Sequence, residues 1–274
     1  MKAHAFLYER PSDVIDASRL LAEAKGEGRI LAGGQTLGPM LNMRLAMPKL
    51  VIDIGGVNEL KNINHFTDRI VVGACVNHAT LEDWTDLSPL GRLLSHAGGS
   101  IAYRAIRNRG TIGGSLCHAD PAADWVTTMS LLQANLLIAS AKERRRLPMS
   151  DFMLGTYSTA LDVDEILVAI DIPKMSSEAR WGYYRICRKV GEFPEALGAV
   201  LLDAPHSVAR VIAGGMNGKP ASLPSIAEFI AATGKTPELS EIETEIHQLE
   251  PEFDTIDLRH HSVAVRLAIL MALA

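Results

Sequence analysis

Two glycine pairs constrain this chain more than any other feature of its sequence. Gly33-Gly34 follows the short run Arg29–Ala32, and Gly113-Gly114 follows the basic stretch Arg104–Arg109. Glycine allows positive backbone φ angles and lets a ligand approach the main chain closely. Successive N–H groups in such a turn form a concave site for an anion. The pairs therefore predict two loops that hold the two phosphates of one dinucleotide from opposite sides.

The spacing around these glycines excludes two common nucleotide sites. Neither pair is followed by the Gly-Lys-Ser/Thr of a P-loop, and neither has the G-x-G-x-x-G spacing of a Rossmann turn. A dinucleotide would therefore be bound by another fold. A single Gly-Gly pair is also compatible with a tight structural turn, so this alternative stays open for each loop taken alone.

The composition is typical of a soluble globular protein with two domains. The chain has 274 residues, of which 47% are hydrophobic and 22% are charged. A net charge of −5 argues against nucleic acid as the main partner. No apolar run approaches the ~18 residues of a membrane span, and the N-terminus lacks the apolar segment of a signal peptide. We therefore expect a cytoplasmic protein.

The three cysteines, Cys75, Cys117 and Cys187, stand far apart and form no C-x-x-C pair. This spacing offers no ligand cluster for zinc or for an iron–sulfur centre. An odd number of cysteines without a secretion signal favours free thiols. We therefore predict no metal site in this chain.

Periodicity and turn chemistry predict an α+β chain. Ser12 or Asp13 is expected to cap the first helix, and Thr80 is expected to cap a later one. The polar, turn-rich segment 173–178 marks a domain boundary. Strands are expected at 4–8, 29–32, 50–54, 70–76, 135–139, 165–172, 181–185, 196–203 and 208–213, and helices at 12–25, 37–45, 88–98 and 125–132.

Four sequence blocks carry a family resemblance. They lie within 32–54, 106–124, 165–173 and 210–215, and together they extend the likeness over nearly the whole chain. In this order the blocks resemble the FAD-binding (medium) subunit of the molybdenum hydroxylases, the family that includes carbon monoxide dehydrogenase and relatives of xanthine dehydrogenase.

The resemblance implies a fold and a cofactor. Residues 1–175 would form an FAD-binding domain of the vanillyl-alcohol oxidase (PCMH) type, with subdomains of about 1–56 and 57–175. A smaller domain, a three-stranded sheet with helices, would follow at 176–274. The N–H groups of 32–36 and 111–115 would bind the pyrophosphate and ribityl parts of FAD.

The resemblance also implies which residues contact FAD. Asp124 would accept hydrogen bonds from cofactor hydroxyls, although a carboxylate at this position also suits a helix N-terminus. Ile101, Ala102 and Leu167 would line the flavin, with plain core packing as the alternative. The full set is Ala32, Gly33, Gly34, Gln35, Thr36, Leu37, Ile101, Ala102, Thr111, Ile112, Gly113, Gly114, Ser115, Asp124, Leu167 and Arg185.

Arg185 stands where some relatives carry a lysine near the flavin ring. Such a cation would favour reduced, anionic flavin. Arg188 or Lys189 would serve instead if the register of this segment shifts, and a charge exposed to solvent or at an interface is the further alternative. No acid–base pair or nucleophile is predicted, because the flavin itself supplies the chemistry.

The function implied is that of an electron-transfer subunit. Electrons would come from two 2Fe–2S clusters on a small partner chain, after a large partner has oxidised a substrate at a molybdopterin cofactor. FAD would pass them to oxygen, NAD or a carrier, in a dimer of heterotrimers. A self-sufficient flavin oxidase or reductase of the same fold is the alternative, and a flavin-binding scaffold without turnover is a second one.

Overall fold

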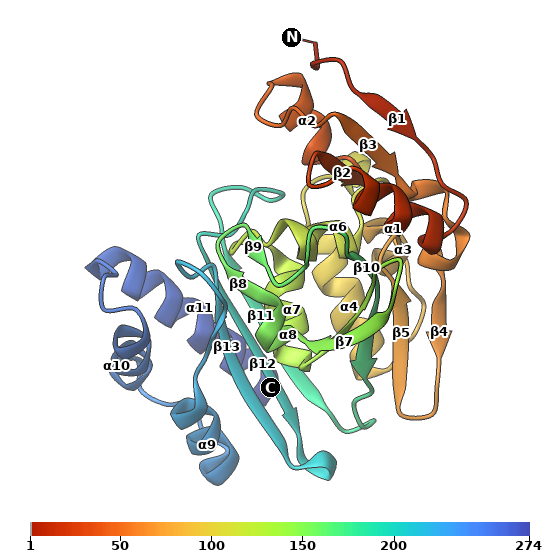
Figure 1. Cartoon of the computed structure of the whole chain (residues 1–274). Helices are drawn as coiled ribbons and strands as arrows, with labels where there is room; N and C mark the ends of the chain where they lie inside the picture. The colour runs from red at the N-terminus through yellow and green to blue at the C-terminus, as the bar shows by residue number, and fades with distance from the viewer. Residues whose placement is uncertain (1) are drawn as a thin grey trace.

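The computed structural model describes residues 2–274, which form three main β-sheets with helices between and around them. Figure 1 shows the N-terminal sheet at one end of the molecule, the helices α4, α6 and α7 at its centre, and the C-terminal helices at the opposite side. The sheets follow one another along the chain, so each groups elements of one sequence region. The α+β class expected from the sequence is confirmed.

The N-terminal sheet is parallel, in the order β1-β3-β2, because helical connections return each strand in the same direction. Helix α1 begins after Asp13, whose carboxylate accepts from the N–H of Asp16, so Asp13 is the cap. Here lie β1 (Leu7–Glu9), α1 (Val14–Glu23), β2 (Gly28–Leu31), α2 (Leu37–Asn42), β3 (Leu50–Asp53) and the 3₁₀ helices η1 (Ile54–Gly56) and η2 (Asn58–Lys61).

The second sheet is antiparallel, in the order β4-β5-β10-β6-β7, beside a two-stranded ribbon of β8 and β9. Its strands are β4 (Ile63–His65), β5 (Arg69–Gly73), β6 (Asn135–Ala139), β7 (Arg144–Pro148), β8 (Met153–Gly155), β9 (Ser158–Thr159) and β10 (Ile166–Pro173). Its helices are α3 (His78–Glu82), α4 (Pro89–Ser100), α5 (Arg104–Arg107), α6 (Ile112–His118), α7 (Asp124–Leu132) and α8 (Met149–Phe152).

The third sheet is antiparallel, in the order β11-β12-β13-β14. Three of its strands are long, as expected, and the two-residue β14 extends the sheet at one edge. The elements are β11 (Arg180–Ile186), β12 (Ala196–Asp203), η3 (Ala204–His206), β13 (Val208–Gly214), β14 (Ala221–Ser222), α9 (Pro224–Thr233), α10 (Leu239–Leu249) and α11 (Thr255–Leu273).

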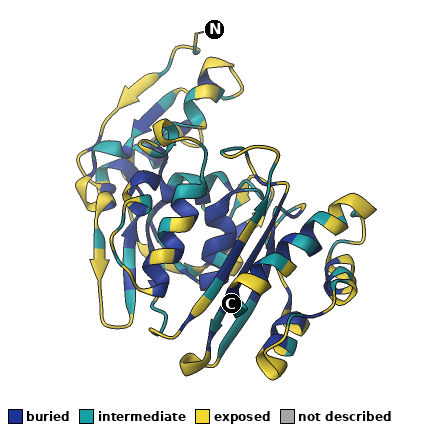
Figure 2. Cartoon of the chain, turned by 180° about the vertical axis from the view of Figure 1, so that it is seen from behind, coloured by how far each residue is buried: buried dark blue, intermediate teal, exposed yellow. Residues whose placement is uncertain are grey.

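Helix α7 joins the second and third sheets. It contacts β10 on one side and β12 and β13 on the other, and all but one of its residues are buried. One hydrophobic core therefore runs from Ile70 in the second sheet to Tyr183 and Ile212 in the third. Figure 2 shows this buried centre in dark blue between the sheets. The predicted boundary at 175 falls between β10 and β11 and stays a prediction.

The capping prediction at Thr80 is wrong. Helix α3 begins at His78, and Asn77 is its cap: the Asn77 Oδ1 atom accepts from the Thr80 N–H at 2.8 Å and from the Thr80 hydroxyl at 2.9 Å. Both residue types favour helix starts, and the extended backbone at Asn77 decides between them.

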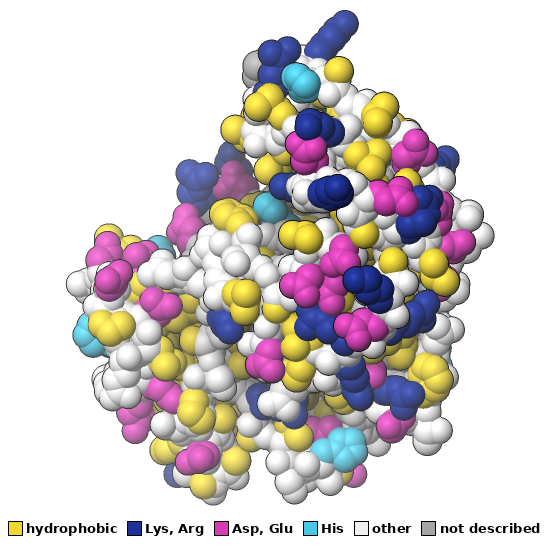
Figure 3. Space-filling model, viewed as in Figure 1, with side chains coloured by type: hydrophobic (Ala, Val, Ile, Leu, Met, Phe, Trp, Pro, Cys, Tyr) yellow, Lys and Arg dark blue, Asp and Glu magenta, His cyan; other side chains and the backbone are white. Residues whose placement is uncertain are grey.

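No helix within the described part of the chain is both long enough and apolar enough to cross a bilayer. On the face shown in Figure 3, Lys and Arg side chains are interspersed with Asp and Glu.

Candidate cofactor site

The first glycine loop offers free backbone donors. It connects β2 to α2, and Gly34 adopts a φ of +74°. Within residues 2–274, the N–H groups of Gly33, Gly34, Gln35 and Thr36 donate no hydrogen bond. The loop accepts hydrogen bonds at its carbonyls: the Gln35 side chain donates to Gly33, the Gly38 N–H to Gly34 and the Met40 N–H to Thr36. Four such N–H groups suit an anion.

The second glycine loop is different, because its N–H groups are already used. Ile112 donates to the Val76 carbonyl at 3.0 Å and Gly113 to the Ala74 carbonyl at 2.9 Å. Gly114 donates to Oγ1 of Thr111, the N-cap of α6, at 3.1 Å, and Ser115 donates to the Thr111 carbonyl at 3.0 Å. The N–H groups of Ile112–Ser115 are therefore used within the chain, and the phosphate contact expected of 111–115 stays a prediction.

Gly113 has a packing reason instead. A Cβ atom built there would lie 2.5 Å from the Cβ atom of Ala74, so only glycine lets α6 lie this close to the chain after β5. What the loop presents for a ligand is the part-buried Ser115 hydroxyl and the Thr111 cap itself.

The two loops nevertheless meet. A Cβ atom on Gly33 would lie 2.1 Å from the carbonyl oxygen of Arg109, which belongs to the segment that leads into the second loop. Between them is a cavity of about 330 Å³ that contains the cations Lys61 and Arg109 and no carboxylate. Its lining residues are Ala32, Gly33, Gly55, Lys61, Cys75, Val76, Asn77, Thr80, Asn108, Arg109 and Thr111.

This charge pattern fits the diphosphate of a dinucleotide. Within the described chain, neither Lys61 nor Arg109 forms an ion pair, so both positive charges remain uncompensated. Phosphate oxygens suit both the free N–H groups and these two side chains.

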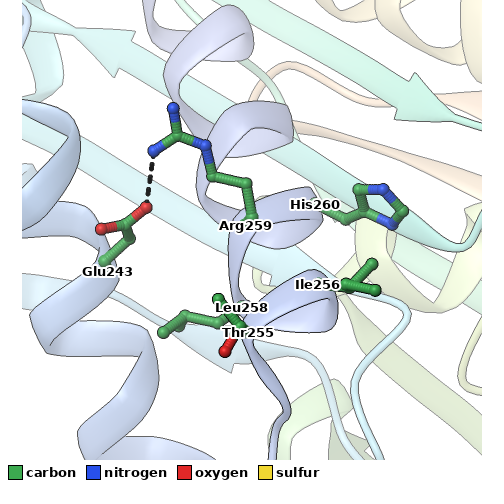
Figure 4. Close-up of a pocket in the computed structure, with 6 residues that line it drawn as sticks. All are labelled: Glu243, Thr255, Ile256, Leu258, Arg259 and His260. Atoms are coloured by element: carbon green, nitrogen blue, oxygen red, sulfur yellow. Dashed lines mark hydrogen bonds and ion pairs between the residues drawn. The ribbon is translucent and has the colours of Figure 1, made fainter.

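A second cavity, of about 500 Å³, lies between α10 and α11. Figure 4 shows its six lining residues, of which Arg259 pairs with Glu243 at 2.8 Å. None of the predicted site residues lines it, and its cation is neutralised. We therefore place the candidate site at the glycine loops.

Asp124, Tyr183 and Arg185 form a buried cluster where α7 meets β11. The Tyr183 hydroxyl donates to Asp124 Oδ1 at 2.9 Å, and Arg185 Nε lies 3.0 Å from the same oxygen. Burial raises the pKa of Asp124, while Arg185 and Tyr183 oppose that shift. Burial, together with the Asp124 charge, raises the pKa of Tyr183 well above its usual value. The predicted residues Asp124 and Arg185 thus contact each other.

The predicted pair Ile101 and Ala102 forms a tight turn at the end of α4. Ala102 adopts a φ of +43°, which is unusual for a residue with a Cβ atom. The Arg107 guanidinium donates to both carbonyls at 2.9 Å and pairs with Glu82 at 2.8 Å. No motif in the sequence singles out Arg107, and its signal is the basic stretch 104–109.

The remaining predictions concern Leu167 and the two alternatives to Arg185, which are Arg188 and Lys189. Leu167 is 3% exposed on β10 and packs in the main core, which fits the packing alternative. Lys189 and Arg188 are exposed and pair with Glu192, whereas the Arg185 side chain is only 12% exposed. Within residues 2–274, no group of His, Cys, Asp and Glu could hold a metal ion.

Comparison with known proteins decides the family. The profile of the family described as FAD binding domain in molybdopterin dehydrogenase matches residues 3–175. This chain belongs to that family. The predicted resemblance to the FAD-binding medium subunit of the molybdenum hydroxylases, the FAD cofactor and the oxidoreductase class are thereby confirmed.

Individual relatives support the same family assignment. The chain is 35% identical over 248 residues to the nicotine 6-hydroxylase medium subunit of Paenarthrobacter nicotinovorans, covering 89% of this chain and 87% of that one. It is 37% identical over 205 residues to caffeine dehydrogenase subunit beta of Pseudomonas sp. strain CBB1, covering 74% and 70%.

Solved structures are similar to this chain over nearly its whole length. A chain of quinoline 2-oxidoreductase from Pseudomonas putida 86 superposes with a TM-score of 0.88 at 30% identity, covering 100% of this chain and 98% of that one. A chain of carbon monoxide dehydrogenase from Hydrogenophaga pseudoflava gives a TM-score of 0.87 at 28% identity, covering 99% and 98%. The individual cofactor contacts stay predictions.

Proposed function

We propose that the FAD diphosphate lies between the two glycine loops, against the free N–H groups of Gly33–Thr36. The observation that carries this proposal is the row of four unused donors beside a cavity with two cations and no carboxylate. Hydrogen bonds from N–H groups to a charged oxygen are stronger than those between neutral groups. Lys61 and Arg109 then add charge from the second side of the cavity.

The flavin end of the cofactor then lies near the turn Ile101–Ala102 and Asp124, as the family resemblance implies. Asp124 accepts from a cofactor hydroxyl, and the turn supports the ring. When bound, FAD supplies a redox centre that takes up and releases electrons, and the chain supplies its position and its electrostatic surroundings.

The function that follows is electron transfer within a molybdenum hydroxylase complex. Electrons reach this subunit from 2Fe–2S clusters on a small partner chain, and a large partner carries the molybdopterin cofactor. The names of relatives support a multi-subunit assembly, since they are called medium subunit, medium chain or subunit beta. We propose a dimer of such heterotrimers in the cytoplasm, with oxygen, NAD or a carrier as acceptor.

The domain organisation belongs to the same proposal. Residues 1–175 form the FAD-binding domain, in subdomains of about 1–56 and 57–175, and residues 176–274 form the C-terminal domain. The match of the family profile to 3–175 supports this division.

An absorption spectrum of the complex purified with its native partners tests this function. The expected result is one FAD per copy of this chain, with iron–sulfur absorbance that follows the small partner. Reduction of the flavin by substrate of the complex, and only when both partners are present, supports electron transfer. Reduction by a substrate of this chain alone would favour the self-sufficient flavin oxidase instead.

A further inference from the structure

Arg185 is held by three separate elements. Its Nη1 atom donates to the carbonyl of Ser100 at the end of α4, at 2.8 Å, and its Nη2 atom donates to the carbonyl of Glu192 in the β11–β12 loop, at 3.0 Å. Its Nε atom lies 3.0 Å from Asp124 Oδ1 at the start of α7. The Arg185 side chain is 12% exposed and that of Asp124 only 4%, so the charges face each other away from water.

The contact between Nε and Oδ1 is an ion pair without an aligned hydrogen bond, because the buried Nε–H has no hydrogen-bond partner. The aligned donor to Oδ1 is the hydroxyl of Tyr183. No other described residue donates a hydrogen bond to Asp124 Oδ2. Tyr183 and Arg185 thus fix one oxygen of the carboxylate and leave the second oxygen for a ligand.

We propose that Arg185 is a positioning residue, which together with Tyr183 orients Asp124 and the Ile101–Ala102 turn toward FAD, and that it does not act as a free cation on the flavin. The inference rests on the proposed FAD site. Ser100 immediately precedes the turn, so the bond to its carbonyl fixes where the turn begins. The guanidinium charge is neutralised by Asp124, and both Nη atoms donate to carbonyl groups of this chain.

A lysine cannot replace these contacts. The planar guanidinium reaches acceptors in three directions, whereas an ammonium group is a single point at the end of a flexible stem. A direct role of the charge requires only a cation, which lysine also supplies. The substitution Arg185→Lys therefore separates the two roles.

The experiment measures the Kd of FAD for the apo full-length chain by flavin fluorescence. Arg180→Lys, on the exposed end of the same strand, is the matched control. We expect Arg185→Lys to raise Kd at least tenfold and the control to leave it unchanged. An Arg185→Lys chain that binds FAD as tightly as the wild type would overturn the inference.

A milder variant covers the case in which Arg185→Lys lowers the melting temperature of the apo chain. Tyr183→Phe removes only the hydroxyl that donates to Asp124, and the ring keeps its packing in the core. We expect Kd to rise at least threefold in this variant while the chain stays folded. An unchanged Kd in a folded Tyr183→Phe chain would overturn the role given to the cluster.

The reduction potential of the bound flavin gives a readout that simple destabilisation does not move. Asp124→Asn leaves the Arg185 charge without its counter-ion, so reduced flavin gains stability. We expect the ratio of the Kd of oxidised to reduced FAD to rise at least tenfold, a positive shift of about 30 mV for a two-electron couple. Lys189→Met should not shift it, and a shift there with none in Asp124→Asn would assign the cation to Lys189.

Failure of the proposed function looks different from failure of this inference. If the wild-type chain binds no FAD, the proposed site is wrong. If it binds FAD and the variants bind equally well, only the positioning role of Arg185 is wrong.

Discussion

The substitution Gly33→Ala tests the first glycine loop most sharply. Its new Cβ atom would lie 2.1 Å from the Arg109 carbonyl oxygen and 2.8 Å from the Gly110 Cα atom, and both obstacles are backbone. The loop must therefore move away from the second one by about an ångström, because hard-sphere contacts leave no rotamer that relieves the clash. The free N–H groups of Gly33 and its neighbours move with it.

The magnitude follows from the donors that lose the phosphate. A hydrogen bond to a charged group contributes about 1.5–3 kcal/mol, so the loss of two of them costs roughly 3–6 kcal/mol. This corresponds to a rise in the Kd of FAD of about a hundredfold to ten-thousandfold. Apo stability should fall much less, because the loop lies outside the main core.

The assay is FAD titration of the apo chain, with the melting temperature measured in parallel. Gly38→Ala is the matched control, because a Cβ atom there meets nothing within 4 Å. It lies in α2, where alanine is favoured by about 1 kcal/mol over glycine. A folded Gly33→Ala chain that keeps the wild-type Kd would refute the reasoning that the loops must stay this close.

Three further predictions concern the surroundings of the site. Arg107→Met should destabilise the fold by about 1–3 kcal/mol and weaken FAD binding, because the Ile101–Ala102 turn loses its donor; chemical denaturation and FAD titration measure both, and unchanged binding would contradict it. Lys61→Met and Arg109→Met should each raise the Kd of FAD about three- to tenfold at low salt and less at high salt, since both side chains are exposed; a salt-independent effect would argue against a charge role. His78 is buried and its pKa is lowered to about 4, chiefly by burial and then by Arg107. As pH falls, His78 takes up its proton in the unfolded chain, near pH 6.5, before it does so in the folded chain, so the folded state loses stability below that pH. From pH 7 to 5 the free energy of unfolding should drop by about 2 kcal/mol. The substitution His78→Asn should remove that drop.

Much of the fold could be predicted because its signals are local. The strand 135–139 and the strand 196–203 have the predicted bounds, since each is a short apolar run between turn residues. The first helix was predicted at 12–25 and spans Val14–Glu23, and the structure selects Asp13 from the two candidate caps, Ser12 and Asp13. Asn77 and Thr80 compete for one helix start, and local preference could not choose between them.

The site was predicted less well where contacts are distant in sequence. Local pattern gave two equivalent glycine loops, but Val76 and Ala74 accept the N–H groups of Ile112 and Gly113, and no motif announces such a pairing. In the same way Asp124 and Arg185 were each assigned to FAD, while the fold brings them together as an ion pair. Arg107, which fixes a turn through hydrogen bonds, is indicated in the sequence only by the basic composition of 104–109.

A structure of the chain with FAD bound tests the central claim most directly. The account predicts that phosphate oxygens of FAD lie within hydrogen-bonding distance of the N–H groups of Gly33–Thr36, with Lys61 and Arg109 beside them. Density for the diphosphate elsewhere, for example in the cavity between α10 and α11, would contradict the account and leave the glycine pairs as structural turns.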